Sequence, residues 1–307
     1  MISGKEVIVT GGAGFIGSTL VERLARENKV TVIDNLHTGV KTNLEDVIRS
    51  GNVSFIHDDV KNINNHDIEG ADYVFHIGSY SSSPMYGKNP YLVGEVVTGM
   101  IGVCEYAKRN RSRVVFASTS SMYSGMKPPH HEKMDLPVTD YYTEGKIGME
   151  RISDLYSKLY GMDIAAMRPF SVYGLRERAK GEYANVVTQF LWAMKGGRPP
   201  VIYGDGSQRR DLTFASDVVD AMTLAAEKNR GFNAYNIGTG RNYDMNDIVG
   251  RINAILGTDI KPSYIAMPIK NYVWENLADT SKAERELGFK AKVDIDHGLR
   301  MINEHYR

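Results

Sequence analysis

The sequence predicts an α/β fold in which helices cover both faces of a doubly wound parallel sheet, with a smaller lobe interleaved toward the C-terminus. Three observations predict this fold class. Short apolar runs alternate with longer helical stretches through the first half of the chain. The first apolar run leads directly into a glycine-rich turn and a helix, and an acidic residue ends the second run. After Pro169 the elements become shorter, and loops rich in glycine and proline separate them.

The expected elements follow in order along the chain. We expect strands at Glu6–Thr10, Val30–Ile33, Val53–Ile56, Tyr73–Ile77, Arg113–Ala117 and Ile164–Arg168, and a later strand at Tyr235–Gly238. Helical spacing of apolar residues predicts helices at Ile16–Glu27, Val97–Lys108, Tyr142–Tyr160, Ser216–Glu227, Met245–Leu256 and Ser281–Leu287. In the helix predicted at Tyr142–Tyr160, one buried face is expected from Ile147, Ile152, Leu155 and Leu159.

The composition narrows the function classes. The 307 residues contain 37 basic and 37 acidic side chains, so no net positive charge attracts nucleic acid or an anionic membrane. The single cysteine, Cys104, excludes an internal disulfide framework and indicates a buried thiol in an intracellular protein. No segment approaches the roughly 20 apolar residues that span a bilayer. Residues 1–10 do not resemble a signal peptide, so we expect a soluble cytoplasmic protein.

The turn between the first strand and the first helix has the composition of a phosphate-binding loop. Glycines in GGAGFIG (11–17) allow tight backbone angles and the close approach of a pyrophosphate. The helix N-terminus that follows offers unpaired N–H groups and the positive end of the helix dipole. The residues expected to contact a dinucleotide here are Gly11, Gly14, Phe15, Ile16 and Gly17.

Asp34 is the acidic residue that ends the second strand. A carboxylate there can accept hydrogen bonds from the adenosine ribose and repels a 2′-phosphate, which favours NAD over NADP. Asn35 follows it, and Asp59 with Val60 comes after the third strand, where Asp59 can face the adenine. The alternatives are a solvated turn for Asp34 and an exposed loop carboxylate for Asp59.

Tyr142 and Lys146 stand four residues apart at the start of a predicted helix, so both side chains share one face. An ammonium near a phenol lowers the pKa of the tyrosine toward neutrality, which gives a general acid/base for a substrate hydroxyl. The strand Arg113–Ala117 ends in hydroxyl side chains at 118–121, where parallel sheets bind ligands. Tyr-x-x-x-Lys is common by chance, so the prediction depends on its combination with the glycine turn, Asp34 and this hydroxyl cluster.

With these features the chain resembles the extended short-chain dehydrogenases/reductases nearly end to end. It is most similar to their NAD-dependent sugar-nucleotide epimerase/dehydratase group, typified by UDP-glucose 4-epimerase. The supporting segments are GGAGFIGSTL (11–20), VIDNLHTG (32–39), FASTSSMY (116–123), YTEGK (142–146), RPFSVYG (168–174), YGDGSQRRDLTFASDVVDA (203–221), NIGTG (236–240) and LADTSKAERELGF (277–289). The later segments belong to the sugar-nucleotide group in particular.

The resemblance implies a division into two parts. Residues 1–169 are expected to form an NAD-binding Rossmann domain, to which 204–240 return. Residues 170–203 and 241–307 are expected to form the substrate-binding lobe. The implied partners are a nucleotide sugar, UDP-linked, and a second copy of the chain packed through the helices near 97–108 and 142–160.

The resemblance also implies roles for individual residues. Tyr142 is expected to be the acid/base, Lys146 to bind the nicotinamide ribose, and Thr119 to hydrogen-bond the reacting sugar oxygen. The residues expected to contact the nucleotide sugar are Ser171, Asn185, Tyr203, Arg210, Lys270 and Asn276. Arg210 offers a fork of donors to phosphate, and its alternative is a surface ion pair with Asp211.

Several departures from the family pattern bear on the substrate. Ser171 and Val96 stand where the family has asparagine, and Ile269, with only Lys270 nearby, stands where it has arginine. Phosphate contacts are therefore fewer, or the nucleotide differs from UDP. The segment SYSSSPM (79–85) is also unusual and is expected to border the sugar. Asn276 replaces a bulky tyrosine of epimerases restricted to unacetylated sugars, so we expect N-acetylhexosamines to be tolerated.

The choice of reaction depends on two serines. Dehydratases of the group carry Asp-Glu after the active-site threonine, and this chain has Ser120 and Ser121, which favours 4-epimerisation through a 4-keto intermediate. A dehydratase or a reductase of the same fold is the alternative, although Asp34 argues against NADPH. A cofactor-sensing binding protein is the non-enzyme alternative, and such proteins commonly lose the Tyr/Lys pair. No metal site is expected, because the segment His130-His131-Glu132 has no second ligand cluster at metal-site spacing.

Overall fold

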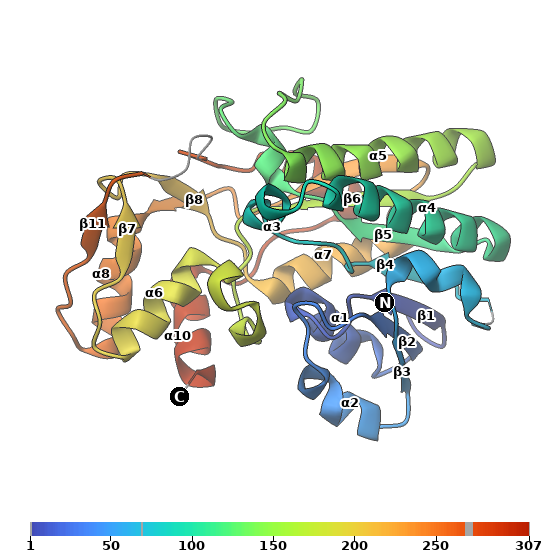
Figure 1. Cartoon of the computed structure of the whole chain (residues 1–307), viewed down its shortest axis with the longest axis horizontal. Helices are drawn as coiled ribbons and strands as arrows, with labels where there is room; N and C mark the ends of the chain where they lie inside the picture. Colours follow the sequence, from blue (N-terminus) through green and yellow to red (C-terminus); the bar gives the residue numbers. More distant parts are fainter. Residues whose placement is uncertain (1, 69, 268–272, 307) are drawn as a thin grey trace.

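The centre of the molecule is a seven-stranded parallel sheet, seen in a computed structural model that describes residues 2–68, 70–267 and 273–306 (Figure 1). Its strands lie in the order β3-β2-β1-β4-β5-β6-β9. Their bounds are β1 Glu6–Thr10, β2 Lys29–Asp34, β3 Val53–His57, β4 Tyr73–His76, β5 Arg113–Ala117, β6 Ile164–Pro169 and β9 Phe232–Ile237. The predicted doubly wound sheet is confirmed. The order reverses between β1 and β4, which opens a crevice at the carboxyl ends of the strands.

Helices cover both faces of this sheet because alternate strand residues point to opposite sides. Val7 and Val9 pack into a core with α1 (Phe15–Leu24) and α7 (Ala215–Lys228). Ile8 between them packs into a second core with α4 (Leu92–Asn110) and α5 (Tyr141–Tyr160). Figure 1 shows these two layers on either side of the sheet. The shorter elements are α2 Glu45–Arg49, α3 Ser83–Lys88 and the 3₁₀ helices η1 Lys41–Leu44, η2 Val60–Asn65, η3 Ser120–Tyr123 and η4 Arg178–Tyr183.

A smaller lobe lies beside the carboxyl edge of the sheet. It has its own apolar core, built on α6 Val186–Lys195, α8 Met245–Leu256 and α10 Ile295–His305. Two small sheets complete it, in which β7 Val201–Tyr203 pairs with β11 Ser263–Ile265 and β8 Arg209–Asp211 pairs with β10 Asn242–Asp244. Figure 1 shows the lobe to one side, with the C-terminus on α10.

The chain passes between the two parts more than once. After β8 it returns to the large sheet through α7 and β9, and α9 (Ser281–Leu287) then packs against both of them. The division into a domain of 1–169 with 204–240 and a lobe of 170–203 with 241–307 stays a prediction. Within the described ranges no helix has the length and hydropathy needed to cross a bilayer. Cys104 is buried in α4, and burial raises the pKa of its thiol to about 12.

The predicted buried face of α5 is wrong for its two leucines, whereas Ile147 and Ile152 are partly buried and pack against apolar cores. Leu155 is 48% exposed and Leu159 is 63% exposed. The side facing the sheet instead carries Tyr142, Thr143, Lys146, Met149, Glu150, Ser153 and Ser157. These polar side chains have partners inside the protein, so their burial needs no apolar pattern, and the apolar pattern of α5 faces outward.

Candidate functional site

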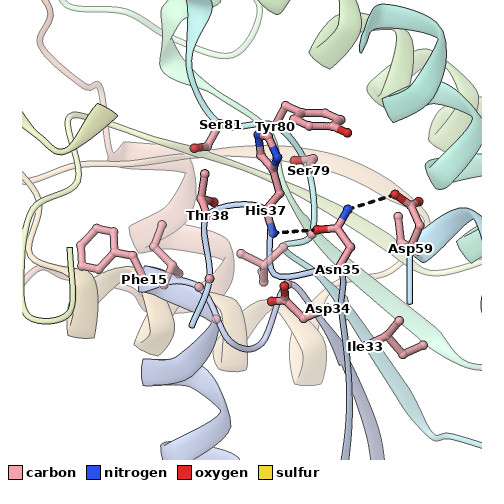
Figure 2. Close-up of a pocket in the computed structure, with 18 of the residues that line it drawn as sticks. Phe15, Ile33, Asp34, Asn35, His37, Thr38, Asp59, Ser79, Tyr80 and Ser81 are labelled. Atoms are coloured by element: carbon pink, nitrogen blue, oxygen red, sulfur yellow. Dashed lines mark hydrogen bonds between the residues drawn. The ribbon is translucent and has the colours of Figure 1, made fainter. Parts of the chain in front are cut away.

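Two adjoining pockets lie at the carboxyl ends of the strands. The first follows the crevice between β1 and β4, where doubly wound sheets bind nucleotides. All of the predicted dinucleotide contacts other than Lys146 line it: Gly11, Gly14, Phe15, Ile16, Gly17, Asp34, Asn35, Asp59 and Val60. Figure 2 shows Phe15 at one end of this pocket and Asp59 at the other, with Asp34 between them.

The glycine turn is too tight for any other residue at two of its positions. Gly11 has a φ of 68°, and a Cβ there would lie 2.5 Å from the Gly78 nitrogen. A Cβ at Gly17 would lie 2.0 Å from the Gly11 carbonyl oxygen. The helix that follows begins at Phe15 with Gly14 as N-cap, and no side chain caps it. Its first N–H groups therefore fit the pyrophosphate of a dinucleotide.

Three polar side chains form the opposite wall of the first pocket. Asp34 is held in place because its carboxylate accepts hydrogen bonds from the Ala13 nitrogen (2.9 Å) and the Leu36 nitrogen (2.7 Å). Burial raises the pKa of Asp34, and these two hydrogen bonds oppose the shift. Asn35 donates to Asp59 over 3.1 Å (Figure 2). A carboxylate fixed at this place fits a free ribose hydroxyl and repels a 2′-phosphate, so the residues present fit NAD.

The second pocket is a cavity of about 670 Å³, and many of the residues that line it carry hydroxyl groups. Tyr142 lies in its wall at the start of α5, which Asp140 caps by accepting from the Thr143 nitrogen over 2.8 Å. Thr119, two residues after β5, lines the same pocket, and its side chain interacts with the Tyr142 hydroxyl. The Thr119 hydroxyl also accepts from the Ser121 nitrogen and thereby caps η3. A phenol and a hydroxyl held together in a pocket wall can bind one oxygen of a substrate and exchange a proton with it.

The predicted direction of the Tyr142 pKa is wrong for this chain. Burial raises the pKa of Tyr142 to about 12, and the hydrogen bond from Thr119 opposes that shift. Lys146 was expected to lower it, yet its Nζ lies 6.0 Å from the centre of the Tyr142 ring. Sequence spacing placed both residues on one face of α5 without showing that burial outweighs their attraction.

Lys146 is buried between β5 and the loop that follows β4. Its Nζ donates to the Ser79 hydroxyl (2.6 Å) and to the Ala117 carbonyl oxygen (2.8 Å), and the side chain lines the second pocket. Burial lowers the pKa of Lys146 to about 7, and Glu150 one turn further along opposes that shift. Near neutral pH this lysine can therefore gain or lose a proton beside Tyr142.

We expect the titration of Lys146 to make the free energy of unfolding depend on pH. Folded Lys146 loses its proton near pH 7, whereas the unfolded chain keeps it to about pH 10.5. Between these values the unfolded state binds more protons, so the folded state gains stability as pH rises. The stability of the wild type relative to Lys146→Met should therefore rise by up to about 1.4 kcal/mol per pH unit above pH 7.

Urea unfolding of both proteins between pH 6 and 10 measures this difference. Lys158→Met, which removes an exposed lysine of the same helix, is the control. A difference between wild type and Lys146→Met that stays level across this range would show that Lys146 keeps an ordinary pKa in the fold.

A buried ion pair lies behind the hydroxyl cluster. Arg168 at the end of β6 makes two hydrogen bonds to Glu150 of α5, Nε to Oε1 (2.9 Å) and Nη2 to Oε2 (2.5 Å). The Ser118 hydroxyl donates to the same carboxylate over 2.5 Å, and Arg168 Nη1 donates to the Tyr123 hydroxyl over 2.6 Å. The pair therefore ties both ends of the segment 118–123, which carries Thr119, to the sheet and to α5.

The predicted substrate contacts are partly brought together. Four of them line the second pocket: Ser171, Asn185, Arg210 and Asn276. Asn276 is fixed there because its Oδ1 accepts from the Asp211 nitrogen (2.8 Å) and its Nδ2 donates to the Ser171 hydroxyl (3.2 Å). Tyr203 lies in β7 and is not among the described residues that line either pocket. Lys270 and Ile269 lie outside the described residues.

Asp211 and the histidine segment have structural partners. Asp211 is buried and accepts hydrogen bonds from Thr239, Gly240 and Ala278. His130 stacks on Tyr123 with the ring centres 5.1 Å apart. No group of three or more His, Cys, Asp or Glu side chains in the described part of the chain is arranged to hold a metal ion.

The unusual segment 79–85 borders both pockets. Ser79 and Ser81 line both of them, and Ser82, Ser83 and Pro84 line the second. Ser83 also donates a hydrogen bond to Asp140, which ties this segment to the start of α5. Ser120 and Ser121 line the second pocket beside Thr119, and Val96 lines the first.

Three residues at these pockets were not predicted from the sequence. The rings of His37 and Tyr80 pack edge to face with centres 5.0 Å apart at the wall of the first pocket (Figure 2). Lys180 lines both pockets. His37 and Tyr80 fall inside the segments 32–39 and 79–85, which the sequence singles out without giving either residue a role. Nothing in the sequence distinguishes Lys180 from an ordinary surface lysine.

Comparison with known proteins agrees with this geometry. The sequence model of the NAD dependent epimerase/dehydratase family matches residues 7–238. The UDP-glucose 4-epimerase of Mycolicibacterium smegmatis is 31% identical, over 98% of this chain and 98% of its own. The structure of UDP-N-acetylglucosamine 4-epimerase from Methanobrevibacter ruminantium M1, in complex with UDP-N-acetylmuramic acid, has a TM-score of 0.92 at 30% identity and covers 99% of both chains. That of UDP-glucose 4-epimerase from Thermotoga maritima, with UDP-glucose, has a TM-score of 0.90 at 30% identity and covers 98% of both.

Proposed function

Because this chain belongs to the NAD-dependent epimerase/dehydratase family, we propose that it interconverts the C4 epimers of a UDP-linked hexose with a retained NAD. The observation that carries the proposal is the hydrogen-bonded pair of Thr119 and Tyr142 beside buried Lys146, where the two pockets meet. Tyr142 acts in its phenolate form, which takes the proton of the sugar 4-hydroxyl and returns it after the 4-keto sugar has turned in the pocket; because burial raises its pKa to about 12, this form is the minor one at neutral pH. A bound NAD, held by the glycine turn, Asp34 and Lys146, would supply the acceptor and the donor of the C4 hydride.

The groups around Thr119 favour epimerisation over dehydration. Removal of water from the sugar ring needs an acid for the leaving hydroxyl and a base for the neighbouring carbon. Ser120 and Ser121 line the pocket where dehydratases of this group carry that acidic pair, and an unperturbed serine hydroxyl serves neither purpose well. Asp34, fixed in the first pocket, supports NAD and not NADPH, which separates the proposal from a reductase.

The direct test is turnover without added cofactor. The purified protein is incubated with UDP-galactose, UDP-N-acetylgalactosamine or UDP-glucuronate, and the product is identified by NMR. We expect the 4-epimer of at least one of them, and NAD released from the protein when it is denatured. A product that has lost water, or turnover that consumes added NADPH, would replace epimerisation by dehydratase or reductase chemistry.

Asn276 is proposed to set tolerance for an N-acetyl group. It is buried at the end of the second pocket, and a tyrosine there would fill space that a larger sugar substituent needs. We expect Asn276→Tyr to lower kcat/KM for UDP-N-acetylgalactosamine at least about tenfold more than for UDP-galactose, since a steric misfit of this kind is worth about 1–3 kcal/mol. Equal losses for both sugars would instead indicate general damage to the pocket.

The outward apolar face of α5 is proposed to pack against a second copy of the chain. Leu155, Leu159 and Tyr160 are exposed on α5, and Ile101 is exposed on α4, which packs against α5. Apolar side chains grouped in this way on a surface mark an interaction site. We expect sedimentation to show a dimer for the wild type and a monomer for Leu155→Asp/Leu159→Asp. Val138→Asp, at an exposed residue outside these helices, should remain dimeric.

A further inference from the structure

Lys180 lies where the two pockets join. It is the charged side chain, among the described residues, that lines both of them. It comes from η4, in the segment between the large sheet and α6. Its Nζ is 5.4 Å from the centre of the Phe15 ring, and Phe15 is the first residue of α1. The ammonium therefore lines the same pocket as the uncapped N-terminus of α1, and both of these groups favour an anion.

The ammonium of Lys180 makes no hydrogen bond within the described part of the chain. The carboxylate near it is that of Glu177, whose Oε1 lies 3.9 Å away, beyond hydrogen-bond distance. Glu177 is fully buried, and its oxygens accept from the Asn185 nitrogen and the Thr188 hydroxyl. The Lys180 side chain is only 17% exposed, so water reaches its three donors poorly. A largely buried ammonium of this kind is best stabilised by a charged acceptor.

The position of Lys180 is fixed by its neighbours in sequence. Gly181 has φ 52° and ψ −121°, a combination that side chains strongly disfavour, so a glycine is required directly after the lysine. Three residues before it, Glu177 is anchored by the hydrogen bonds from Asn185 and Thr188. The backbone on both sides of Lys180 is therefore restricted before any ligand binds, which reduces the entropy lost on binding.

We propose that Lys180 binds an oxygen of a diphosphate group at this junction. The proposal rests on the proposed function, in which both the dinucleotide and the nucleotide sugar carry a diphosphate. The position beside Phe15 favours the pyrophosphate of the dinucleotide, because the first N–H groups of α1 face the same pocket. The glycine turn then binds this pyrophosphate from the sheet, and Lys180 binds it from a segment that leads into the smaller lobe.

The test measures ligand binding and not turnover. Protein freed of cofactor is titrated with NAD by calorimetry for the wild type, Lys180→Met, Lys180→Arg and Arg178→Met. Loss of a charge-assisted hydrogen bond predicts about 10- to 100-fold weaker NAD binding for Lys180→Met. Lys180→Arg should stay within about threefold of the wild type because it keeps the charge. Arg178→Met, which removes an exposed charge from the same short helix, is the matched control.

A second titration separates the two sources of diphosphate. Each NAD-loaded protein is titrated with UDP. Weaker NAD binding with unchanged UDP binding assigns Lys180 to the dinucleotide, and the reverse result assigns it to the nucleotide sugar. A change of less than about twofold in both overturns the proposal. If the wild type binds NAD and UDP but converts no nucleotide sugar, the proposed function fails while the role of Lys180 is still decided by these titrations.

Discussion

Replacing Tyr142 by phenylalanine is expected to slow 4-epimerisation about 10²- to 10⁴-fold while the protein retains its NAD. The variant loses one oxygen, the phenol hydroxyl that Thr119 contacts in the wall of the second pocket. The ring that packs against Tyr86 with centres 5.3 Å apart is kept, so the core around it should stay intact. Proton transfer to and from the sugar hydroxyl then has no positioned acid/base. The loss should be in kcat, measured with saturating UDP-sugar.

Tyr141→Phe is the matched control for this experiment. Tyr141 precedes Tyr142 in the same helix, but its side chain is exposed and lines neither pocket in the described part of the chain. Its kcat should match that of the wild type. Retention of more than a tenth of the wild-type kcat by Tyr142→Phe would assign proton transfer to another group.

Arg168→Met is expected to lower the free energy of unfolding by about 3–5 kcal/mol. It leaves the Glu150 carboxylate buried with the Ser118 hydroxyl as its remaining side-chain donor. It also removes the donor to the Tyr123 hydroxyl, so the segment that carries Thr119 is held less firmly. The loss should appear as a lower denaturant midpoint at pH 7 with an unchanged slope.

A second variant tests whether an unpaired buried charge is the cause. In Arg168→Met/Glu150→Leu both charges are gone, so this protein should be more stable than Arg168→Met alone. Arg151→Met, next to Glu150 on the exposed side of α5, should lie within about 0.5 kcal/mol of the wild type. Equal stability of Arg168→Met and Arg151→Met would show that the Arg168–Glu150 ion pair does not hold this site in place.

The sequence predicts the sheet well because its strands depend on local patterns. Each of the six strands predicted in the first half agrees with the structure to within one residue at either end. The side of α5 that faces the sheet could not be predicted from a local pattern. Its outward leucines have the spacing of a core face, whereas its inward side holds Lys146 and Glu150 with partners on other elements. Apolar periodicity indicates that one face of a helix is covered, but it does not show which surface covers that face.

Some residues of the candidate site could likewise be predicted from the sequence, and others could not. The glycine turn, Asp34, Tyr142 and Lys146 are recognisable because short spacings carry their chemistry. The Arg168–Glu150 pair joins residues on a strand and a helix, and Lys180 acts through a junction that only the folded chain creates. The pKa of Tyr142 could not be predicted either, since burial sets it and burial is a property of the whole fold.

The last strand of the large sheet has a consequence for synthesis on the ribosome. β9 forms the edge beside β6, yet residues 170–231 must be made between the two strands. Until they are made, the hydrogen-bonding edge of β6 has no neighbour, and α9, which covers α7 and β9, comes later still. A nascent chain therefore carries an open strand edge, the kind that pairs with other chains, while residues 170–231 are being made. We therefore expect the yield of native protein to depend on how fast this middle segment is translated.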